Sequence, residues 1–328
     1  MSKRVLVAGG AGFLGSYISD YYLNNGCMVD CVDNLSTSTG VNIQHLRDKD
    51  EFRFFKADIV GTLPKKINET KYQIVINLAS PASPPHYQRL AIETLQVGSQ
   101  GTLNLLELAR RSDARFFHAS TSEVYGDPEV HPQPESYWGK VHSYGPRSMY
   151  DESKRYAEAL IFSYRQKYGV STCIARFFNT YGPRMDPEDG RVVSNFIIQA
   201  LEGHPITIYG EGLQTRSFCY VDDLVKGITA LIDSDESEPM NLGNPGEFTI
   251  KELAEMIIKK TDSDSKVIYL PLPGDDPTQR KPDITLAKTK LGWEPTIPLD
   301  KGIDLTIGYF AKLVREAKSD FKTPKPIL

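Results

Sequence analysis

The sequence has few of the features that mark secreted, membrane-spanning or nucleic-acid-binding proteins. Its 328 residues include only four cysteines, and these lack the paired spacing of metal ligands, so we expect buried reduced thiols and no metal site. No apolar run approaches the ~18 to 20 residues of a membrane span, and glycines interrupt the apolar stretch near the amino terminus. The formal net charge of -4 offers no basic field to a nucleic acid. These absences favour a soluble, cytoplasmic protein that binds neither a membrane nor a nucleic acid.

The first half of the chain instead contains strand-like and helix-like segments in alternation. Short apolar runs such as residues 27–33 and 52–58 alternate with amphipathic stretches, among them two long helices expected at about residues 88–111 and 148–167. This alternation predicts an α/β fold with a parallel sheet covered by helices on both faces. Beyond residue 179 prolines and glycines become frequent, as in a smaller domain whose loops close over a ligand.

A glycine-rich stretch, VLVAGGAGFLGS, follows the first strand-like run and has G-x-x-G-x-x-G spacing at Gly9, Gly12 and Gly15. Glycines there permit a tight turn and a close approach of the backbone to a pyrophosphate at the helix amino terminus. Asp33 follows 18 residues after Gly15, at the end of the second strand, where an acidic side chain binds a ribose hydroxyl. Because residues 34–39 contain no Arg or Lys to receive a 2′-phosphate, the pattern predicts NAD rather than NADP.

The predicted cofactor site extends to the ends of later strands. Asp58 ends the third strand and either contacts the adenine or caps the amino terminus of a helix. The full predicted cofactor set is Gly9, Gly12, Phe13, Leu14, Gly15, Asp33, Asn34, Asp58, Ile59, Leu78, Ala79, Tyr150 and Lys154. We therefore predict a Rossmann-type, doubly wound sheet in an NAD-binding domain of residues 1–180. Residues 181–328 would form a smaller, interleaved α/β substrate domain, with some segments returning to the first.

Tyr150 and Lys154 form the only Tyr-x-x-x-Lys in the chain, and they open the helix that follows the fifth strand. Their spacing places both side chains on one helix face, where the ammonium can lower the pKa of the phenol until it serves as a base near neutral pH. Thr121 lies at the carboxyl end of the fifth strand, where open α/β sheets bind ligands. A surface Tyr–Lys pair is the alternative interpretation.

These residues resemble the extended short-chain dehydrogenase/reductases, and the resemblance narrows to the UDP-glucuronic acid decarboxylases. The stretches that carry it include LASPASPPHY, STSEVYGDPEVHPQPESYWG, GPRSMYDESKR, RFFNTYGPRMDPEDGRVVSNF, YGEGLQTRSFCYVDDLV, NLGNPGEFTI, DDPTQRKPDI and LGWEP, so it covers nearly the whole chain. It implies a redox-neutral cycle: C4 of the sugar is oxidised with Tyr150 as base and NAD as hydride acceptor, CO2 leaves the 4-keto acid, and C4 is reduced again. It also implies a homodimer built on the two long helices.

The trio Thr121, Ser122 and Glu123 separates two reaction types within this resemblance. Sugar-nucleotide 4,6-dehydratases are similar to this chain but carry Asp between the Thr and the Glu, because expulsion of the C6 hydroxyl as water needs an acid. CO2 leaves without being protonated, so Ser122 favours decarboxylation. Thr121 is expected to bind the C4 oxygen, and Glu123 to position the ring or a water for reprotonation. The predicted catalytic residues are Thr121, Ser122, Glu123, Tyr150 and Lys154.

The resemblance also indicates residues that bind the nucleotide, the diphosphate or the sugar. They are Asn179, Arg191, Val192, Tyr209, Gln214, Arg216 and Arg280. The planar fork of Arg suits phosphate and carboxylate oxygens, although any one of these arginines could instead form an ion pair between domains.

Two positions depart from the decarboxylase pattern, and both lie in the first long helix. Glu93 stands where many decarboxylases have Lys, and it would repel an anionic sugar if it faced the site but be neutral if it faced solvent. Gly98 stands where they have Asn, and with Gly101 it could let this helix pack close to the nicotinamide. A UDP-sugar 4-epimerase or 4,6-dehydratase, or an NAD-binding protein without turnover, are the alternatives.

Overall fold

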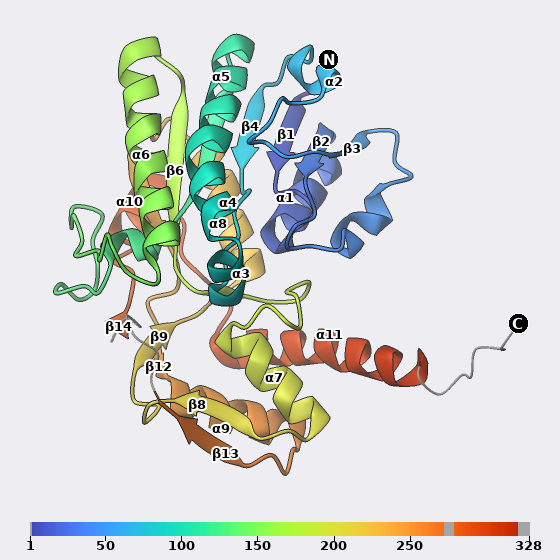
Figure 1. The fold of residues 1–328 in the computed structure, drawn as a ribbon, viewed down its shortest axis with the longest axis vertical. Coiled ribbons are helices and arrows are strands. Elements are labelled where there is room, and N and C mark those ends of the chain that lie inside the picture. Colours follow the sequence, from blue (N-terminus) through green and yellow to red (C-terminus); the bar gives the residue numbers. More distant parts are fainter. Residues whose placement is uncertain (1, 272–278, 321–328) are drawn as a thin grey trace, which may run out of the picture.

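A seven-stranded parallel sheet forms the larger part of the computed structural model, which describes residues 2–271 and 279–320 (Figure 1). The strands lie in the order β11 (Pro239–Leu242), β6 (Thr172–Phe177), β5 (Arg115–Thr121), β4 (Ile74–Asn77), β1 (Arg4–Ala8), β2 (Met28–Asp33) and β3 (Phe52–Lys56). Every neighbouring pair is parallel. The predicted doubly wound α/β sheet is therefore confirmed, and β11 joins it from the second half of the chain.

Helices cover both faces of this sheet, which explains why its strands are nearly continuous apolar runs. On one face Val5 and Val7 pack with α1 (Phe13–Asn24) and α8 (Val221–Asp233). On the other face Leu6 and Ala8 pack with α5 (Thr102–Ser112) and α6 (Ser148–Tyr168). Short elements complete this part: η1 (Val41–Leu46), α2 (Lys65–Asn68), α3 (Pro84–Arg89), α4 (Ala91–Gln96) and η3 (Ser122–Tyr125).

The helix expected at about residues 88–111 is interrupted by a π-helical turn. The turn, η2 (Val97–Gly101), joins α4 to α5 and contains Gly98. A Cβ atom on Gly98 would lie 2.8 Å from the backbone oxygen of Ser153 in α6. Gly98 thus lets this segment pack closely against α6 at Ser153, the residue before Lys154. The close approach predicted from the sequence was to the nicotinamide instead.

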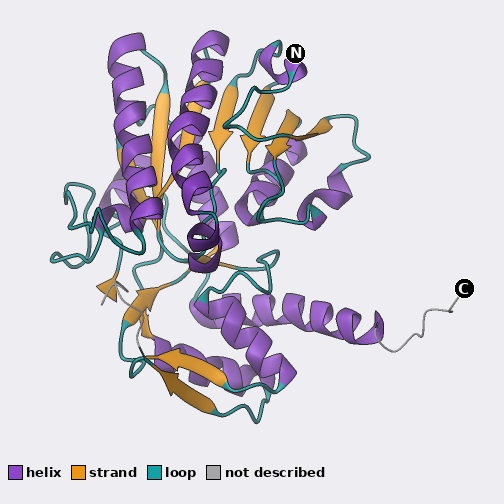
Figure 2. Cartoon of the chain, viewed as in Figure 1, coloured by secondary structure: helices purple, strands orange, loops and turns teal. Residues whose placement is uncertain are grey.

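A smaller part lies below the carboxyl ends of the strands (Figure 2). Its helices are α7 (Val192–Glu202), α9 (Ile250–Thr261) and α11 (Leu299–Asp320), whereas α10 (Thr285–Leu291) packs beside the sheet against β11 and α8. Its short strands are β7 (Thr180–Tyr181), β8 (Ile206–Tyr209), β9 (Thr215–Ser217), β10 (Cys219–Tyr220), β12 (Glu247–Thr249), β13 (Val267–Leu270) and β14 (Gln279–Arg280). The start of the DDPTQRKPDI stretch, at residues 275–278, and residues 321–328 lie outside the described residues.

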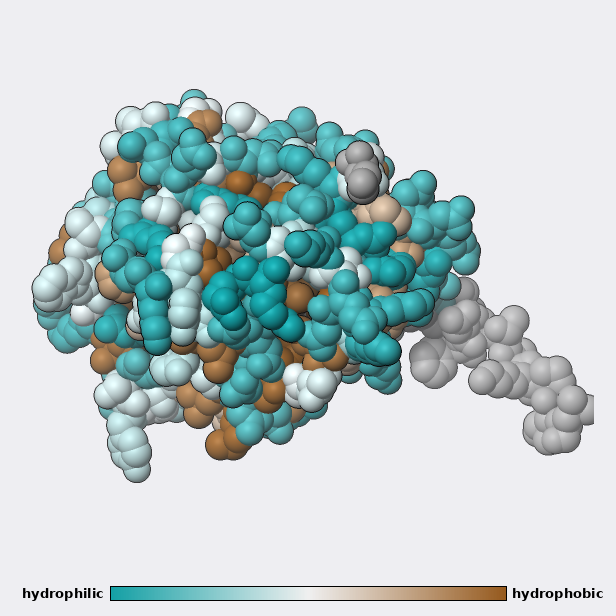
Figure 3. Space-filling model, turned by 90° about the horizontal axis from the view of Figure 1, so that it is seen from above, coloured by the Kyte–Doolittle hydropathy of each residue, from teal (hydrophilic) through white to brown (hydrophobic). Residues whose placement is uncertain are grey.

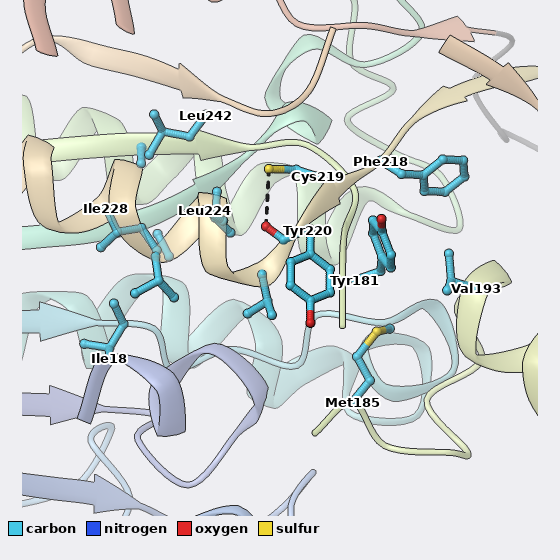
Figure 4. Close-up of a cluster of buried hydrophobic side chains, with 14 of the residues drawn as sticks. Ile18, Tyr181, Met185, Val193, Phe218, Cys219, Tyr220, Leu224, Ile228 and Leu242 are labelled. Atoms are coloured by element: carbon cyan, nitrogen blue, oxygen red, sulfur yellow. Dashed lines mark hydrogen bonds between the residues drawn. The ribbon is translucent and has the colours of Figure 1, made fainter. Parts of the chain in front are cut away.

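One hydrophobic cluster runs from the sheet into the smaller part. Figure 4 shows Ile18 of α1 near Leu224 and Ile228 of α8, with Tyr181 and Tyr220 between the sheet and α7. The four cysteines are free and buried, as predicted from their apolar contexts. Hydrophilic side chains cover most of the face seen in Figure 3, with apolar ones scattered among them. None of the helices in the described part of the chain could cross a membrane.

Candidate active site

A cavity of about 900 Å³ opens at the carboxyl ends of the central strands. Its walls come from the segments that follow β1, β2, β3 and β4, from the end of β5, and from residues 184–191 and α11 on the opposite side. All thirteen residues of the predicted cofactor set line it, including Tyr150 and Lys154. Residues far apart in sequence thus meet at the edge of the sheet where open α/β folds bind ligands.

The glycine loop at one end of the cavity has the shape that a pyrophosphate requires. Gly9 has a φ of +74°, and a Cβ there would lie 2.7 Å from the backbone nitrogen of Ala79. A Cβ on Gly15 would collide with the carbonyl oxygen of Gly9. No side chain caps the amino terminus of α1, which begins after Gly12, so its first N–H groups are available to an anion. These residues fit the phosphates of a dinucleotide.

Two carboxylates lie beside this loop. Asp33 accepts hydrogen bonds from the backbone N–H groups of Ala11, at 3.1 Å, and Leu35, at 2.8 Å. Burial raises the pKa of Asp33, and those N–H groups partly offset the rise. Asp58 accepts from the Asn34 side chain at 2.9 Å and from the Val60 N–H at 2.8 Å. Asp58 therefore caps a turn, and the alternative that it caps a helix is wrong.

Tyr150 and Lys154 lie on the inner face of α6, and both are at least nine-tenths buried. The Lys154 ammonium donates to the Ala119 carbonyl at 2.8 Å and lies 5.8 Å from the centre of the Tyr150 ring. Burial raises the pKa of Tyr150, and a hydrogen bond with Thr121 lowers it only in part. Burial outweighs the charges near Tyr150, and the predicted effect of Lys154 on this pKa stays a prediction.

The trio Thr121, Ser122 and Glu123 begins where β5 ends, with Thr121 capping η3. Ser122 is buried, and its hydroxyl accepts a hydrogen bond from Arg280 at 2.9 Å. Glu123 is paired with Arg280, at 3.1 Å, and with Arg147, at 2.7 Å. Burial raises the pKa of Glu123, but the two guanidinium groups lower it by more, so that it falls to about 2. Glu123 is therefore a fixed anion at neutral pH.

The predicted substrate residues do not form one cluster. Arg191 lines the cavity and pairs with Asp189 at 2.6 Å, and Val192 begins α7 next to it. Arg280 is almost fully buried beneath the trio rather than in the cavity wall. The other four lie outside the lining of this cavity: Asn179, Tyr209, Gln214 and Arg216. Glu93 lies in the lining but is exposed, so its charge is solvated at the rim.

Two residues of the site were missed in the sequence. Arg147 precedes α6 and holds Glu123, but a single Arg in a loop carries no spacing signal. Tyr87 in α3 stacks on Tyr150, with ring centres 4.9 Å apart and an angle of 14° between the planes. Tyr87 falls within the LASPASPPHY stretch, which could have pointed to it.

Comparison with known proteins places this arrangement among nucleotide-sugar enzymes. A family model described as GDP-mannose 4,6 dehydratase matches residues 6–306. A UDP-glucuronic acid decarboxylase 1 of Xenopus tropicalis is 48% identical over 324 residues, which cover 99% of this chain and 76% of the relative. UDP-glucuronic acid decarboxylase 1 of Arabidopsis thaliana is 48% identical over 307 residues, covering 94% of this chain and 69% of the relative.

Solved structures show the same fold with other activities. A UDP-glucose 4-epimerase of Thermotoga maritima, solved with UDP-glucose, has a TM-score of 0.87 and 30% identity, and the match covers 95% of this chain and 99% of that one. A UDP-glucuronic acid 4-epimerase of Bacillus cereus, solved with UDP-glucuronic acid and NAD, has a TM-score of 0.86 and 28% identity over 94% of this chain and 99% of that one. The chain therefore belongs to the extended short-chain dehydrogenase/reductase family of nucleotide-sugar enzymes, on the branch of the UDP-glucuronic acid decarboxylases.

Proposed function

We propose that the chain binds NAD and decarboxylates UDP-glucuronate to UDP-xylose through a 4-keto intermediate. The observation that carries the proposal is the trio at the end of β5, whose middle residue is a serine bonded to Arg280 rather than an acid. The name shared by relatives that are 48% identical supports the same reaction. Removal of the C6 carboxyl group from a glucuronosyl unit leaves a xylosyl unit, which identifies the product.

Tyr150 would take the proton of the C4 hydroxyl as C4 is oxidised, and would return it when C4 is reduced. The Thr121 hydroxyl, which is already hydrogen-bonded to Tyr150, is placed to bind the same oxygen. Lys154 supplies a buried positive charge near the ring, which favours the phenolate as the proton leaves. NAD, held by the glycine loop and Asp33, would supply the hydride acceptor and then the donor, so that no external reductant is needed.

The ketone at C4 lies β to the C6 carboxylate and makes the C5–C6 bond labile. Its electron pair passes into the carbonyl as CO2 leaves, and the resulting enolate takes up one proton at C5. Glu123 remains ionised at neutral pH, since its pKa is about 2. Its role would therefore be to accept hydrogen bonds from the ring or from a water, not to donate the proton.

The remaining predicted substrate residues are assigned to the nucleotide end of the ligand. Arg191 faces the cavity and can approach the diphosphate if its pairing with Asp189 is exchanged for phosphate oxygens. The exposed ring of Tyr209, with Gln214 bonded to its carbonyl at 2.8 Å, lies in the smaller part that would cover the nucleotide. In this proposal residues 1–180 hold the cofactor, and residues 181–328 hold the nucleotide.

A homodimer and a cytoplasmic location complete the proposal. Large apolar side chains are exposed on the helices expected to pair between subunits: Ile92 and Leu95 on α4, and Tyr156 on α6. A four-helix interface would bury them. Light scattering should give twice the 36.7 kDa of one chain, and the single-chain mass at micromolar concentration would contradict the dimer. The four buried free cysteines support a reducing compartment.

The reaction is tested with UDP-glucuronate labelled at the carboxyl carbon. Purified protein should release the label as CO2 in amounts equal to the nucleotide sugar consumed, without added reductant, and should not dehydrate UDP-glucose or dTDP-glucose. Formation of UDP-galacturonate without CO2 would favour the 4-epimerase alternative, which the likeness to the Bacillus cereus enzyme makes the main competitor. A 4-keto-6-deoxy sugar from a neutral substrate would favour a dehydratase.

A further inference from the structure

The inner face of α6 carries a third functional side chain after Tyr150 and Lys154. Glu158 follows Lys154 by one further four-residue step, so the three side chains form a row along the helix. Its carboxylate is mostly buried, with a side-chain exposure of 13%. We propose that Glu158 is a positioning residue that keeps the Lys154 ammonium charged inside the cavity. The expected effect of Glu158 on turnover rests on the proposed function, and its expected effect on the titration of Lys154 does not.

Three hydrogen bonds hold the Glu158 carboxylate in place. The Ser120 hydroxyl donates to it at 2.5 Å, and Arg176 of β6 donates from two nitrogens, at 3.0 and 2.6 Å. Arg176 is itself anchored, since it donates to the Tyr125 hydroxyl at 3.0 Å and to the Glu135 carbonyl at 3.2 Å. A carboxylate with this many partners keeps one position.

The end of β5 ties this carboxylate to Lys154. Ala119 and Ser120 are consecutive: the carbonyl of Ala119 accepts from the Lys154 ammonium, and the hydroxyl of Ser120 donates to Glu158. Ala119, Ser120 and Lys154 all line the cavity, whereas Glu158 lies behind them and does not. Glu158 therefore acts on the site through its neighbours and without contact with the ligands.

The surroundings of Lys154 offer little else to stabilise its charge. Lys154 is 6% exposed, and its ammonium donates to a neutral carbonyl, that of Ala119. His118 in β5 is buried, neither of its ring nitrogens has a partner among the described residues, and burial lowers its pKa, so it is neutral. Tyr150 holds its proton because burial raises its pKa. Burial lowers the pKa of Lys154 to about 8, and Glu158 is the group that opposes this.

The groups packed around Glu158 itself do not remove its charge. Arg176 is the cation that faces it, and the pKa of this guanidinium is raised by the pairing, although burial opposes the rise. The hydroxyls of Tyr125 and Ser120 are neutral donors or acceptors, and burial raises the pKa of Glu135, which favours its neutral form. Loss of the Glu158 charge should therefore be felt mainly at Lys154 and Arg176.

The test measures the titration of Lys154 directly, which needs neither substrate nor turnover. Lysine labelled with carbon-13 at Cε is followed by NMR across a pH series, and the Lys154 signal is assigned by its loss in Lys154→Met. Glu158→Gln keeps the size and the acceptor for Ser120 but removes the charge, so the Lys154 midpoint should fall by about one pH unit or more. Glu152→Gln is the matched control on the same helix, since that side chain is 36% exposed, and the midpoint should not move.

A second variant predicts a shift in the opposite direction. Arg176→Gln leaves the Glu158 charge without its cation, so the Lys154 midpoint should rise. A general loosening of the fold cannot move the Lys154 midpoint in opposite directions in the two variants. If one variant does not fold, the midpoint in the other still tests the proposal. An unchanged midpoint in the variant that folds would overturn the proposal.

Turnover of UDP-glucuronate gives the functional readout. In Glu158→Gln the alkaline limb of the kcat/KM profile should move to lower pH with the Lys154 midpoint, so that activity lost at pH 8 is largely regained at pH 6. A loss equal at all pH values would indicate a purely structural role. If the wild-type chain fails to release CO2 while the NMR shifts occur, the proposed function fails and the inference about Glu158 stands.

Discussion

The cofactor end of the cavity is built differently from the catalytic end, where Tyr150 lines the wall and the trio lies just outside the cavity lining. The glycine loop and Asp33 come from one short stretch, and the two backbone hydrogen bonds that Asp33 accepts join residues 22 and 2 positions apart. At the catalytic end the hydrogen bond between Ser122 and Arg280 joins residues 158 positions apart, and Glu123 takes its second cation from Arg147. The first end depends on local backbone shape, and the second on how distant segments pack around a buried charge.

This difference predicts where substitutions will act. Changes at the cofactor end should alter retention of NAD and leave the rest of the fold intact, because backbone groups supply most of that site. Changes at the catalytic end should alter turnover, and some should also alter stability with pH, because the groups there are charged and buried.

The largest effect is expected for Tyr150→Phe. The change removes the base for C4 oxidation but leaves a ring to stack on Tyr87, so turnover should fall by ~10² to 10⁴-fold with nucleotide binding nearly intact. Steady-state kinetics and calorimetry with UDP measure the two quantities. Turnover within a factor of two of the wild type would show that another group is the base.

A large loss of decarboxylation is also expected for Ser122→Asp. The new carboxylate would compete with Glu123 for Arg280 and would lie near the carboxylate that must leave, and such repulsion costs on the order of several kcal/mol in a closed site. CO2 release should fall by ~10²-fold or more, with little dehydration gained. Ser122→Ala is the control, since it removes the hydrogen bond without adding charge. Equal rates in both variants would exclude the charge as the cause.

A smaller effect is expected at the cofactor end for Asp33→Ala. Loss of a charged hydrogen bond to the ribose should weaken NAD retention by ~1.5 to 3 kcal/mol, and NAD should then be lost during purification. Absorbance of the denatured protein supernatant measures the retained cofactor. Equal NAD content in mutant and wild type would contradict the ribose assignment, and an intact circular dichroism spectrum serves as the control.

The smallest effect is expected for Asp151→Asn, and it depends on pH. Burial and then the charge of Glu123 raise the pKa of Asp151 from 3.8 to about 7, and one of its oxygens has no partner in the described part of the chain. A raised carboxyl pKa costs the folded state stability as pH rises through this window, so the amide should stabilise the chain at pH 8 and not at pH 4. Urea unfolding should show a gain on the order of 1 to 2 kcal/mol at pH 8. The same gain at both pH values would assign it to something other than titration.

The sequence predicts the two ends of the site to different depths, for the same physical reason. Periodicity and glycine spacing are local, and they correctly predict the sheet and α6. All thirteen residues predicted to bind the cofactor lie in the cavity wall, and their contact with NAD stays a prediction. The raised pKa of Tyr150 could not be predicted, because its first cause is burial of a side chain that stacks on Tyr87 from a distant segment. Arg147 and Arg280 reach the trio through contacts between distant segments, and no periodic pattern in the sequence indicates such contacts.

The central claim is an internal cycle in which the hydride removed from C4 returns to C4. It is tested most directly by NMR with UDP-glucuronate that carries deuterium at C4, without added NAD or reductant. The account predicts UDP-xylose that retains the deuterium at C4, together with an equal amount of CO2. UDP-galacturonate as the product, or UDP-xylose that has lost the deuterium, would contradict it.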